Sequence, residues 1–336
     1  MDVDAYVAAS RQRWDRLDQL IRRAGRPRGM TGQEIDELVD SYQRAATSLS
    51  VLRSSGPDPA LLARLSSLVA RARSVITGVQ VPAWQVVAYF FAVIFPAAAY
   101  RARWWWAGAT LGSLLVAYGT GAWVASTPEV QAAIGTPAEI RQMVEHDFAD
   151  YYSSDPAASF AARVWTNNAW VAAGSLALGI LLGLPTLYIL ATNSLNVGVA
   201  GGLMVAYGKG SVFFGLILPH GMLELTAVFL AAAAGLRLGW TVIDPGHRRR
   251  VDALAEEGRS AVTIAVGLVL VLFISGLVEA FVTPSGLPTA ARIAIGFVAE
   301  AAFLAYVLVL GRRAARAGIT GDLERGLRPD TAPVAG

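Results

Sequence analysis

Apolar residues recur at spacings of three and four along the first 80 residues, with charged residues at the positions between them. This periodicity predicts amphipathic helices. We expect one helix over residues 2–24, a second from Thr31, where Thr31 and Glu34 match a capping box, and a third from Asp58 as cap. The predicted helix faces carry Tyr6, Ser10, Arg13, Trp14, Leu17, Leu20, Ile21, Ile35, Leu38, Val39, Tyr42, Ala46, Leu49, Leu61, Leu62, Leu65, Leu68, Val69, Ala72 and Val75. Residues 1–80 are therefore predicted to form a cytoplasmic three-helix domain, with docking of a partner as the alternative use of its surface.

From residue 79 onward the pattern changes to long apolar runs. A helix needs about 20 apolar residues to cross a hydrocarbon core of about 30 Å. We predict six spans, at about 104–125, 167–191, 195–218, 218–239, 260–282 and 290–310. The fold class is thus all-α: a polytopic transmembrane helix bundle of about six spans with an N-terminal cytoplasmic helical domain. The expected domains are 1–80, a transmembrane domain 81–311 with an outer loop 126–163, and a cytoplasmic tail 312–336.

The apolar segment 79–100 is interrupted by Pro82, Gln85 and Pro96. If it crossed the membrane, the basic loop 237–259 would lie outside, against the positive-inside bias. We therefore predict that residues 82–100 form an interfacial elbow helix, with the three tryptophans at 104–106 as an anchor at the headgroup level.

The distribution of charge sets the expected orientation. The loop 126–163 contains six acidic residues and two arginines, so it is predicted to lie outside, whereas the arginine-rich segments lie inside. Both termini are then cytoplasmic, and the first 80 residues contain no apolar core of the signal-peptide type. The expected location is the bacterial cytoplasmic membrane.

Composition excludes several other classes of protein. The chain is 54% hydrophobic and 16% charged, which is too apolar for an ordinary soluble domain. It has no cysteine, so disulfides and thiolate metal sites are excluded. No basic stripe with interleaved aromatic residues is present, which argues against nucleic acid as a partner.

Polar residues inside the predicted spans are the leading candidates for a functional site. His220 and Glu224 follow Pro219, read here as a helix start, and their spacing places them on one face of the helix. The predicted directions of the spans bring Asn167, Asn168 and Glu279 to a similar depth near the outer leaflet. Intramembrane ionisable residues are expensive, so they indicate a site by default. Three uses stay open: a hydrogen-bonded cluster that joins helices, a ligand or ion site, and catalysis.

Enzymatic activity is the least favoured of these uses. A catalytic zinc ion needs three protein ligands, but His220 and Glu224 supply two, and the remaining histidines, His146 and His247, fall on opposite sides of the membrane. No serine or cysteine hydrolase motif is present. We therefore expect no catalytic residues, no metal and no cofactor.

Glycine positions predict two further features. Gly208, Lys209 and Gly210 interrupt the third predicted span and suggest a broken helix, in which Lys209, the one lysine, caps exposed carbonyls or reaches water; the alternative is a span boundary with a snorkelling lysine. Glycine pairs four residues apart, at 108 and 112, 179 and 183, and 198 and 202, favour close helix packing within the chain, with dimerisation as the alternative.

Several tracts together resemble the stage II sporulation protein M family. They are NNAWVAAGSLALGILLGLPT from residue 167, Asn193, the PHGMLEL box with Pro219 and Gly221, AAGLRLG, DPG with its following basic run, and EAFVTPS with Pro284. Around the N-terminal domain, Trp14, Leu17, Leu20 and the YQR at 42–44 are also similar. Ser194 stands where the family usually has glycine after Asn193.

The resemblance implies an integral membrane component that organises partners in envelope or cell-wall remodelling. On this reading the partners are the bilayer, other membrane or envelope proteins and a second copy of the chain. The alternative function is a transporter or channel that uses the polar site around His220 and Glu224 together with the interrupted third span.

Overall fold

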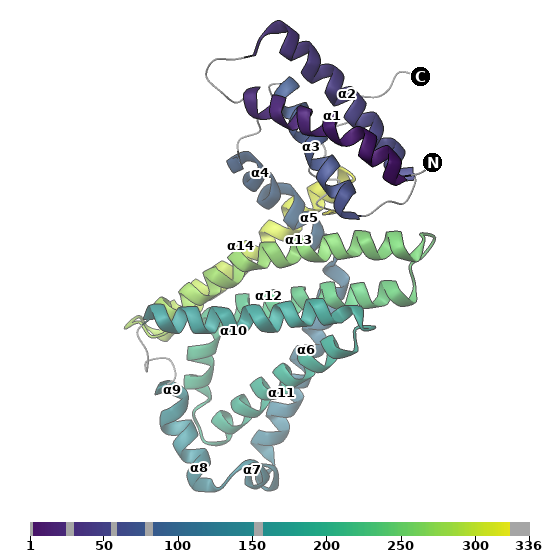
Figure 1. The fold of residues 1–336 in the computed structure, drawn as a ribbon. Coiled ribbons are helices and arrows are strands. Elements are labelled where there is room, and N and C mark those ends of the chain that lie inside the picture. Colours follow the sequence, from purple (N-terminus) through teal and green to yellow (C-terminus); the bar gives the residue numbers. More distant parts are fainter. Residues whose placement is uncertain (1–2, 25–29, 55–58, 78–82, 151–156, 323–336) are drawn as a thin grey trace. The chain divides into compact units, whose positions relative to one another are not determined.

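The structure is a computed structural model that describes residues 3–24, 30–54, 59–77, 83–150 and 157–322 (Figure 1). All regular structure in these ranges is helical, as the sequence predicts. The chain separates into two compact units, Met1–Gln85 and Val86–Gly336.

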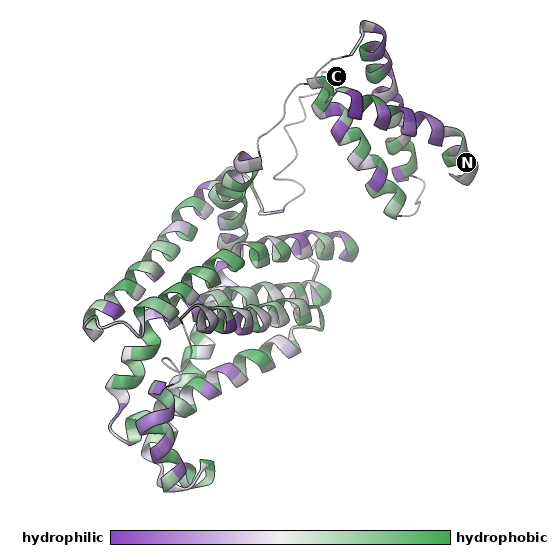
Figure 2. Cartoon of the chain, turned by 60° about the vertical axis from the view of Figure 1, so that its left-hand side comes forward, coloured by the Kyte–Doolittle hydropathy of each residue, from purple (hydrophilic) through white to green (hydrophobic). Residues whose placement is uncertain are grey.

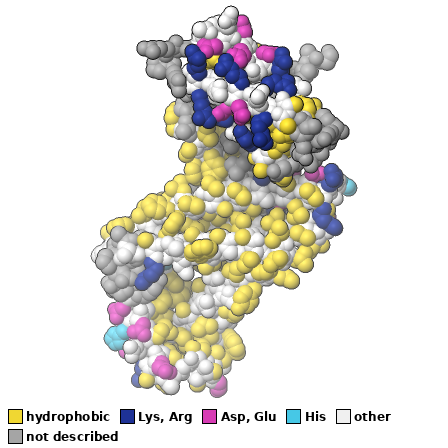
Figure 3. All heavy atoms as spheres, in the orientation of Figure 1, with side chains coloured by type: hydrophobic (Ala, Val, Ile, Leu, Met, Phe, Trp, Pro, Cys, Tyr) yellow, Lys and Arg dark blue, Asp and Glu magenta, His cyan; other side chains and the backbone are white. Residues whose placement is uncertain are grey.

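The N-terminal unit contains α1 (Val3–Ala24), α2 (Gly32–Ser54) and α3 (Pro59–Thr77). Its core is built from the predicted stripes, with Leu17, Leu52 and Leu65 almost fully buried. The capping box is confirmed, because the Glu34 amide donates to Thr31 Oγ1 and the Thr31 amide donates to Glu34 Oε2. The predicted cap Asp58 lies outside the described residues. The surface of this unit carries both basic and acidic side chains (Figure 3), and all its basic side chains are arginines because the unit contains no lysine.

The second unit consists of a series of helices connected by short turns. In chain order they are α4 (Ala83–Tyr89), η1 (Phe90–Ile94), α5 (Phe95–Arg101), α6 (Arg103–Ser126), α7 (Pro128–Ile134), α8 (Pro137–Gln142), η2 (Met143–Asp147), α9 (Phe148–Asp150), α10 (Ala157–Ala177), η3 (Leu178–Ile180), α11 (Leu184–Ala206), α12 (Gly210–Ile243), α13 (Arg250–Leu277), η4 (Val278–Val282) and α14 (Thr289–Arg316). Figure 2 shows that apolar residues predominate along these long helices, as expected for helices in lipid.

Within the described residues, four helices are long and apolar enough to cross a membrane: α11, α12, α13 continued by η4, and α14. A fifth span results if Trp84–Arg101 and α6 are counted together, and these two segments are bent by 62° at their junction. The helix α10 is not among these candidates. It packs along α12, where a Cβ at Gly235 would lie 2.2 Å from the Ser175 carbonyl oxygen of α10. In η3, a Cβ at Gly179 would lie 2.2 Å from the Gly235 carbonyl oxygen. The count of six spans stays a prediction that depends on α6 and α10.

Two of the predicted span boundaries are wrong. The span expected at 167–191 is divided by the turn at Leu181–Gly183, where Leu182 and Gly183 have positive φ angles of 58° and 75°. The span expected at 195–218 is divided at Tyr207–Lys209. The apolar sequence runs on through the turn at 181–183, so hydropathy alone could not locate it. The interruption at 207–209 was predicted from Gly208, Lys209 and Gly210.

The predicted elbow differs from expectation in its environment. The chain bends after Arg101, but α5 is buried: Phe95, Ala97, Ala98 and Ala99 are at most 1% exposed. Small residues on neighbouring segments make room for it, since a Cβ at Gly267 would lie 2.1 Å from the Phe95 ring and one at Gly311 would lie 2.3 Å from the Pro96 carbonyl. Residues 95–99 therefore belong to the core of the unit, whereas residues 84–89 of the predicted elbow are exposed. Residues 79–82 lie outside the described residues.

Glycines of α11 allow it to pack closely along α6. A Cβ at Gly198 would lie 2.6 Å from the Ala117 carbonyl oxygen, and one at Gly202 would lie 2.6 Å from that of Gly121. The contacting residue numbers increase in the same direction along both helices, so α6 and α11 run parallel. Gly108 and Gly112 have no neighbour within 4 Å, so this pair is not used for packing within the chain.

Candidate functional site

Three ionisable side chains meet where α12 passes the end of α13. His220 and Glu224 lie one turn apart on α12, and Glu279 lies in η4. One potential ligand atom from each lies within 4.8 Å of those of the other two. His220 and Glu279 are 5% and 3% exposed, and Glu224 is partly buried. We refer to His220, Glu224 and Glu279 as the His–Glu–Glu cluster.

The hydrogen bonds around this cluster come from hydroxyl groups. Thr283 Oγ1 lies 3.2 Å from His220 Nδ1, and Ser275 Oγ donates to Glu224 Oε2 across 3.5 Å and to the His220 carbonyl across 3.0 Å. His220 Nε2 lies 3.7 Å from Glu279 Oε1, whereas Glu279 Oε2 is buried without a hydrogen-bond partner. The carboxylates are thus only partly satisfied, which is costly at this depth unless a proton or cation joins them.

The sequence-based grouping of five residues is wrong for two of them. No hydrogen bond among the described residues links Asn167 or Asn168 to the cluster, and Asn167 is exposed. The physical reason is the true start of α10 at Ala157, which places the two asparagines about 15 Å along the helix and not at its first turn. Glu224 pairs with Ser275 and not with an asparagine.

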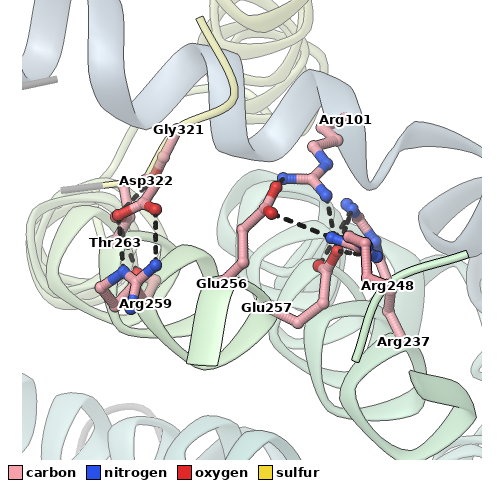
Figure 4. Close-up of polar contacts among 9 residues, drawn as sticks. All are labelled: Arg101, Arg237, Arg248, Glu256, Glu257, Arg259, Thr263, Gly321 and Asp322. Atoms are coloured by element: carbon pink, nitrogen blue, oxygen red, sulfur yellow. Dashed lines mark hydrogen bonds and ion pairs between the residues drawn. The ribbon is translucent and has the colours of Figure 1, made fainter. Parts of the chain in front are cut away.

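A second polar cluster, which sequence reasoning did not assemble, lies at the opposite ends of α12 and α13 (Figure 4). Arg101 donates to Glu256 at 2.9 Å and to Glu257 at 2.6 Å, and Arg237 donates to Glu257 at 2.9 Å. Arg248 completes the group with a 2.9 Å bond to Glu256. The sequence feature that could have indicated this cluster is the pair of adjacent glutamates, Glu256 and Glu257, near the basic start of an otherwise apolar helix. Only the fold shows which arginines bind them.

The C-terminal segment is held at the same end by ion pairing. Arg259 donates twice to Asp322, at 2.7 and 2.8 Å, and Thr263 Oγ1 donates to the Gly321 carbonyl. Asp322 has no exposed side-chain surface. Gly321 has φ +79° and lies against Ala98 of α5, where a Cβ would overlap.

One further buried carboxylate lies between α12 and α14. Thr226 Oγ1 donates to Glu300 Oε1 at 2.9 Å, and Glu300 Oε2 is buried without a partner. An acidic residue inside an apolar helix is itself the signal that could have identified it.

Comparison with protein families decides what the second unit is. The model for stage II sporulation protein M matches residues 109–284, which is more than half of the 336-residue chain. The chain belongs to the stage II sporulation protein M family. A separate model, a domain of unknown function, matches residues 4–78.

Two curated relatives cover parts of the same chain. The uncharacterized protein MJ0793 of Methanocaldococcus jannaschii is 29% identical over 123 residues, covering 36% of this chain and 69% of the relative. The uncharacterized protein MJ0706 of the same organism is 25% identical over 126 residues, covering 36% of this chain and about half, 54%, of the relative. No solved structure matches the chain.

The family match includes the His–Glu–Glu cluster and the predicted motif residues. Pro219 was predicted to start a helix, but it lies inside α12. A Cβ at Gly296 of α14 would lie 2.2 Å from the Pro219 carbonyl oxygen, so α14 packs directly against this position. Gly221 is buried, the Asn193 amide donates to the Ile189 carbonyl, and Pro284 is exposed in the turn after η4.

The residues Gly208, Lys209 and Gly210 form a turn between two candidate spans of this family member. The helix α11 ends at Ala206 and α12 begins at Gly210, with Gly208 at φ +74°. The chain is interrupted where predicted, but the interruption separates two spans and does not break one. This arrangement favours the alternative of a span boundary at Lys209 and weakens the broken-span argument for transport.

Proposed function

We propose that this family member is a membrane scaffold whose N-terminal unit recruits partners to its membrane unit. The observation that carries the proposal is the combination of a compact, charged three-helix unit with a separate apolar unit of candidate spans, each matched by its own family model. Such a chain presents a water-facing binding surface and holds it at a bilayer. No catalytic step or cofactor is part of the proposal.

A groove on the N-terminal unit supports a recruiting role. It has a volume of about 250 Å³ between α1 and α3, with apolar residues such as Trp14 and Leu61 in its lining. Four arginines and two aspartates also line it: Arg11, Arg22, Arg64, Arg71, Asp15 and Asp18. The excess of positive charge favours an amphipathic, acidic segment of a membrane or envelope protein as the partner.

The experiment is quantitative affinity purification of the full chain from native membranes. Reversing charge in the groove with Arg11→Glu and Arg64→Glu should remove the specific partners, because both arginines are exposed and do not support the core. Arg73→Glu is the matched control, since Arg73 is exposed on α3 but outside the groove. Recovery of the same proteins with all three variants would contradict recruitment through this groove.

The transport alternative has weaker support. Buried His220 and Glu279 pack between helices, and the turn at Lys209 separates two spans. A flux of ions or solutes into proteoliposomes that is abolished by Glu224→Gln, with partner recovery unchanged, would favour transport over the scaffold.

A further inference from the structure

We propose that His220, Glu224 and Glu279 form a binding site for one divalent transition-metal ion. The sequence supplied two ligands on α12, one fewer than a catalytic or open zinc site uses. The fold adds a third by bringing η4 against α12, so that a nitrogen and two carboxylate oxygens face one another within 4.8 Å. This inference concerns the membrane unit and does not depend on the recruiting role of the N-terminal unit.

The hydrogen bonds of His220 orient the ring for metal binding. Thr283 Oγ1 lies 3.2 Å from His220 Nδ1 and 3.5 Å from the Val278 carbonyl oxygen. When the hydroxyl donates to that carbonyl, its oxygen can accept from His220 Nδ1–H. That tautomer directs the lone pair of Nε2 toward Glu279 Oε1, 3.7 Å away. Metal-binding histidines commonly donate their other ring N–H to such an outer partner, which fixes the ring.

Charge balance also favours a cation. Two carboxylates bring up to two negative charges, and across the described part of the chain neither Glu224 nor Glu279 forms an ion pair with lysine or arginine. The nearby Arg292 donates instead to the Thr283 carbonyl and to Thr289. One carboxylate oxygen, Glu279 Oε2, has no hydrogen-bond partner, and water cannot easily reach it because the side chain is only 4% exposed. A divalent ion would neutralise both carboxylates and supply the missing interaction.

The donor set narrows the class of ion. One imidazole nitrogen with two carboxylate oxygens suits Zn²⁺, Mn²⁺, Fe²⁺ or Co²⁺, whereas Mg²⁺ and Ca²⁺ favour sites of oxygen alone. Ligands of a tetrahedral ion at 2.0–2.1 Å lie roughly 3.4 Å apart, so the glutamate side chains need to close by little more than an ångström. Three protein ligands leave a position open for water or for a group of a partner.

The test uses the full chain, purified in detergent with a tag that contains no histidine and stripped with a chelator. Co²⁺ is the probe, because its visible absorption reports the ligand field and elemental analysis gives the bound amount. We expect about one Co²⁺ per chain, displaced by Zn²⁺. His220→Ala and Glu279→Gln should each weaken binding by about 100-fold or more, and Thr283→Val by about tenfold, since outer-shell partners alone contribute 10- to 100-fold.

Two matched controls identify the site. Glu300→Gln removes another buried carboxylate of the same unit, and the double variant His146→Ala with His247→Ala removes the other histidines; both should bind Co²⁺ as the unaltered chain does. Variants that elute as aggregates are replaced by Thr283→Val, which removes a single hydroxyl. The proposal is overturned if the stripped chain binds no Co²⁺ in the micromolar range, or if cluster variants bind as tightly as the controls. The first result would mean that protons alone balance the two carboxylates.

Discussion

Arg101 Nη2 donates a 2.6 Å hydrogen bond to Glu257 Oε1, although the two residues are 156 positions apart in the chain. Glu257 is 4% exposed and also accepts from Arg237 (Figure 4). The bond from Arg101 joins the end of α5 to the first turns of α13, and the bond from Arg237 joins α12 to the same carboxylate. Glu257 therefore holds together one end of the membrane unit, while the His–Glu–Glu cluster lies about 33 Å farther along α13.

Removing Glu257 should strongly destabilise the unit. Glu257→Ala leaves Arg101 and Arg237 partly buried without their shared carboxylate, and breaking a buried ion pair in this way costs about 3–5 kcal/mol. Asp252→Ala is the control, because its pair with Arg249 is 4.0 Å long and exposed, and such pairs contribute about 0–1 kcal/mol. Thermal unfolding in detergent measures both variants. Equal losses would show that the cluster is not a structural tie.

The glycines of α11 predict a contrast between two packing positions. Gly202→Ala places a Cβ 2.6 Å from the Gly121 carbonyl oxygen, and forcing α6 and α11 apart should cost about 1–3 kcal/mol. Gly112→Ala meets nothing within 4 Å and should be neutral or stabilising by up to about 1 kcal/mol, as alanine favours a helix. Unfolding measurements on the purified chain compare them. If Gly112→Ala is the harmful change, the open face of α6 packs against another molecule.

The capping box of α2 gives a pH dependence with a definite sign. The Thr31 amide donates to Glu34, and this hydrogen bond, helped by Arg23, holds the pKa of Glu34 below its usual value. A carboxyl with a lowered folded pKa stabilises the fold above its unfolded pKa, and the contribution is lost as pH falls through the folded pKa.

Glu34→Ala should therefore speed hydrogen exchange in the first turn of α2 at about pH 7. The difference should shrink as the pH falls through the lowered pKa of Glu34, because the protonated carboxyl carries no charge. Comparing variant and unaltered chain at each pH cancels the intrinsic dependence of exchange on pH. A penalty that persists unchanged in acid would mean that the side chain acts through packing and not through its charge.

Orientation is testable because the chain contains no cysteine. Single cysteines at Glu139 and Arg249, both exposed, should be labelled by an impermeant reagent from opposite sides of the membrane. The expectation follows from the acidic loop near Glu139 and the basic turn before α13. Three long helices, α10, α11 and α12, lie between the two positions. Labelling of both from one side would contradict the six-span arrangement and point to α10, the one of the three that is not a candidate span, as a helix that does not cross.

The sequence by itself determined the helical fold, the stripes that build the N-terminal core, the capping box at Thr31 and the presence of costly polar residues such as His220 and Glu224 in apolar segments. These features are local: they depend on periodicity, on caps and on the price of charge in lipid. The sequence thus identified the two members of the cluster that lie on one helix, His220 and Glu224.

Tertiary structure alone decided which residues meet. Glu279 and Thr283 reach His220 from about 60 positions away, and Asn167 does not, because α10 begins ten residues earlier than its hydropathy suggested. The burial of α5 and the turn at Gly183 were likewise not predicted, because in lipid an apolar sequence has the same composition whether it faces lipid tails, neighbouring helices or a turn. The interruption at Gly208 was predicted, because two glycines and a lysine stand there. Close packing through glycine backbones, and not hydrophobicity, selected among those environments.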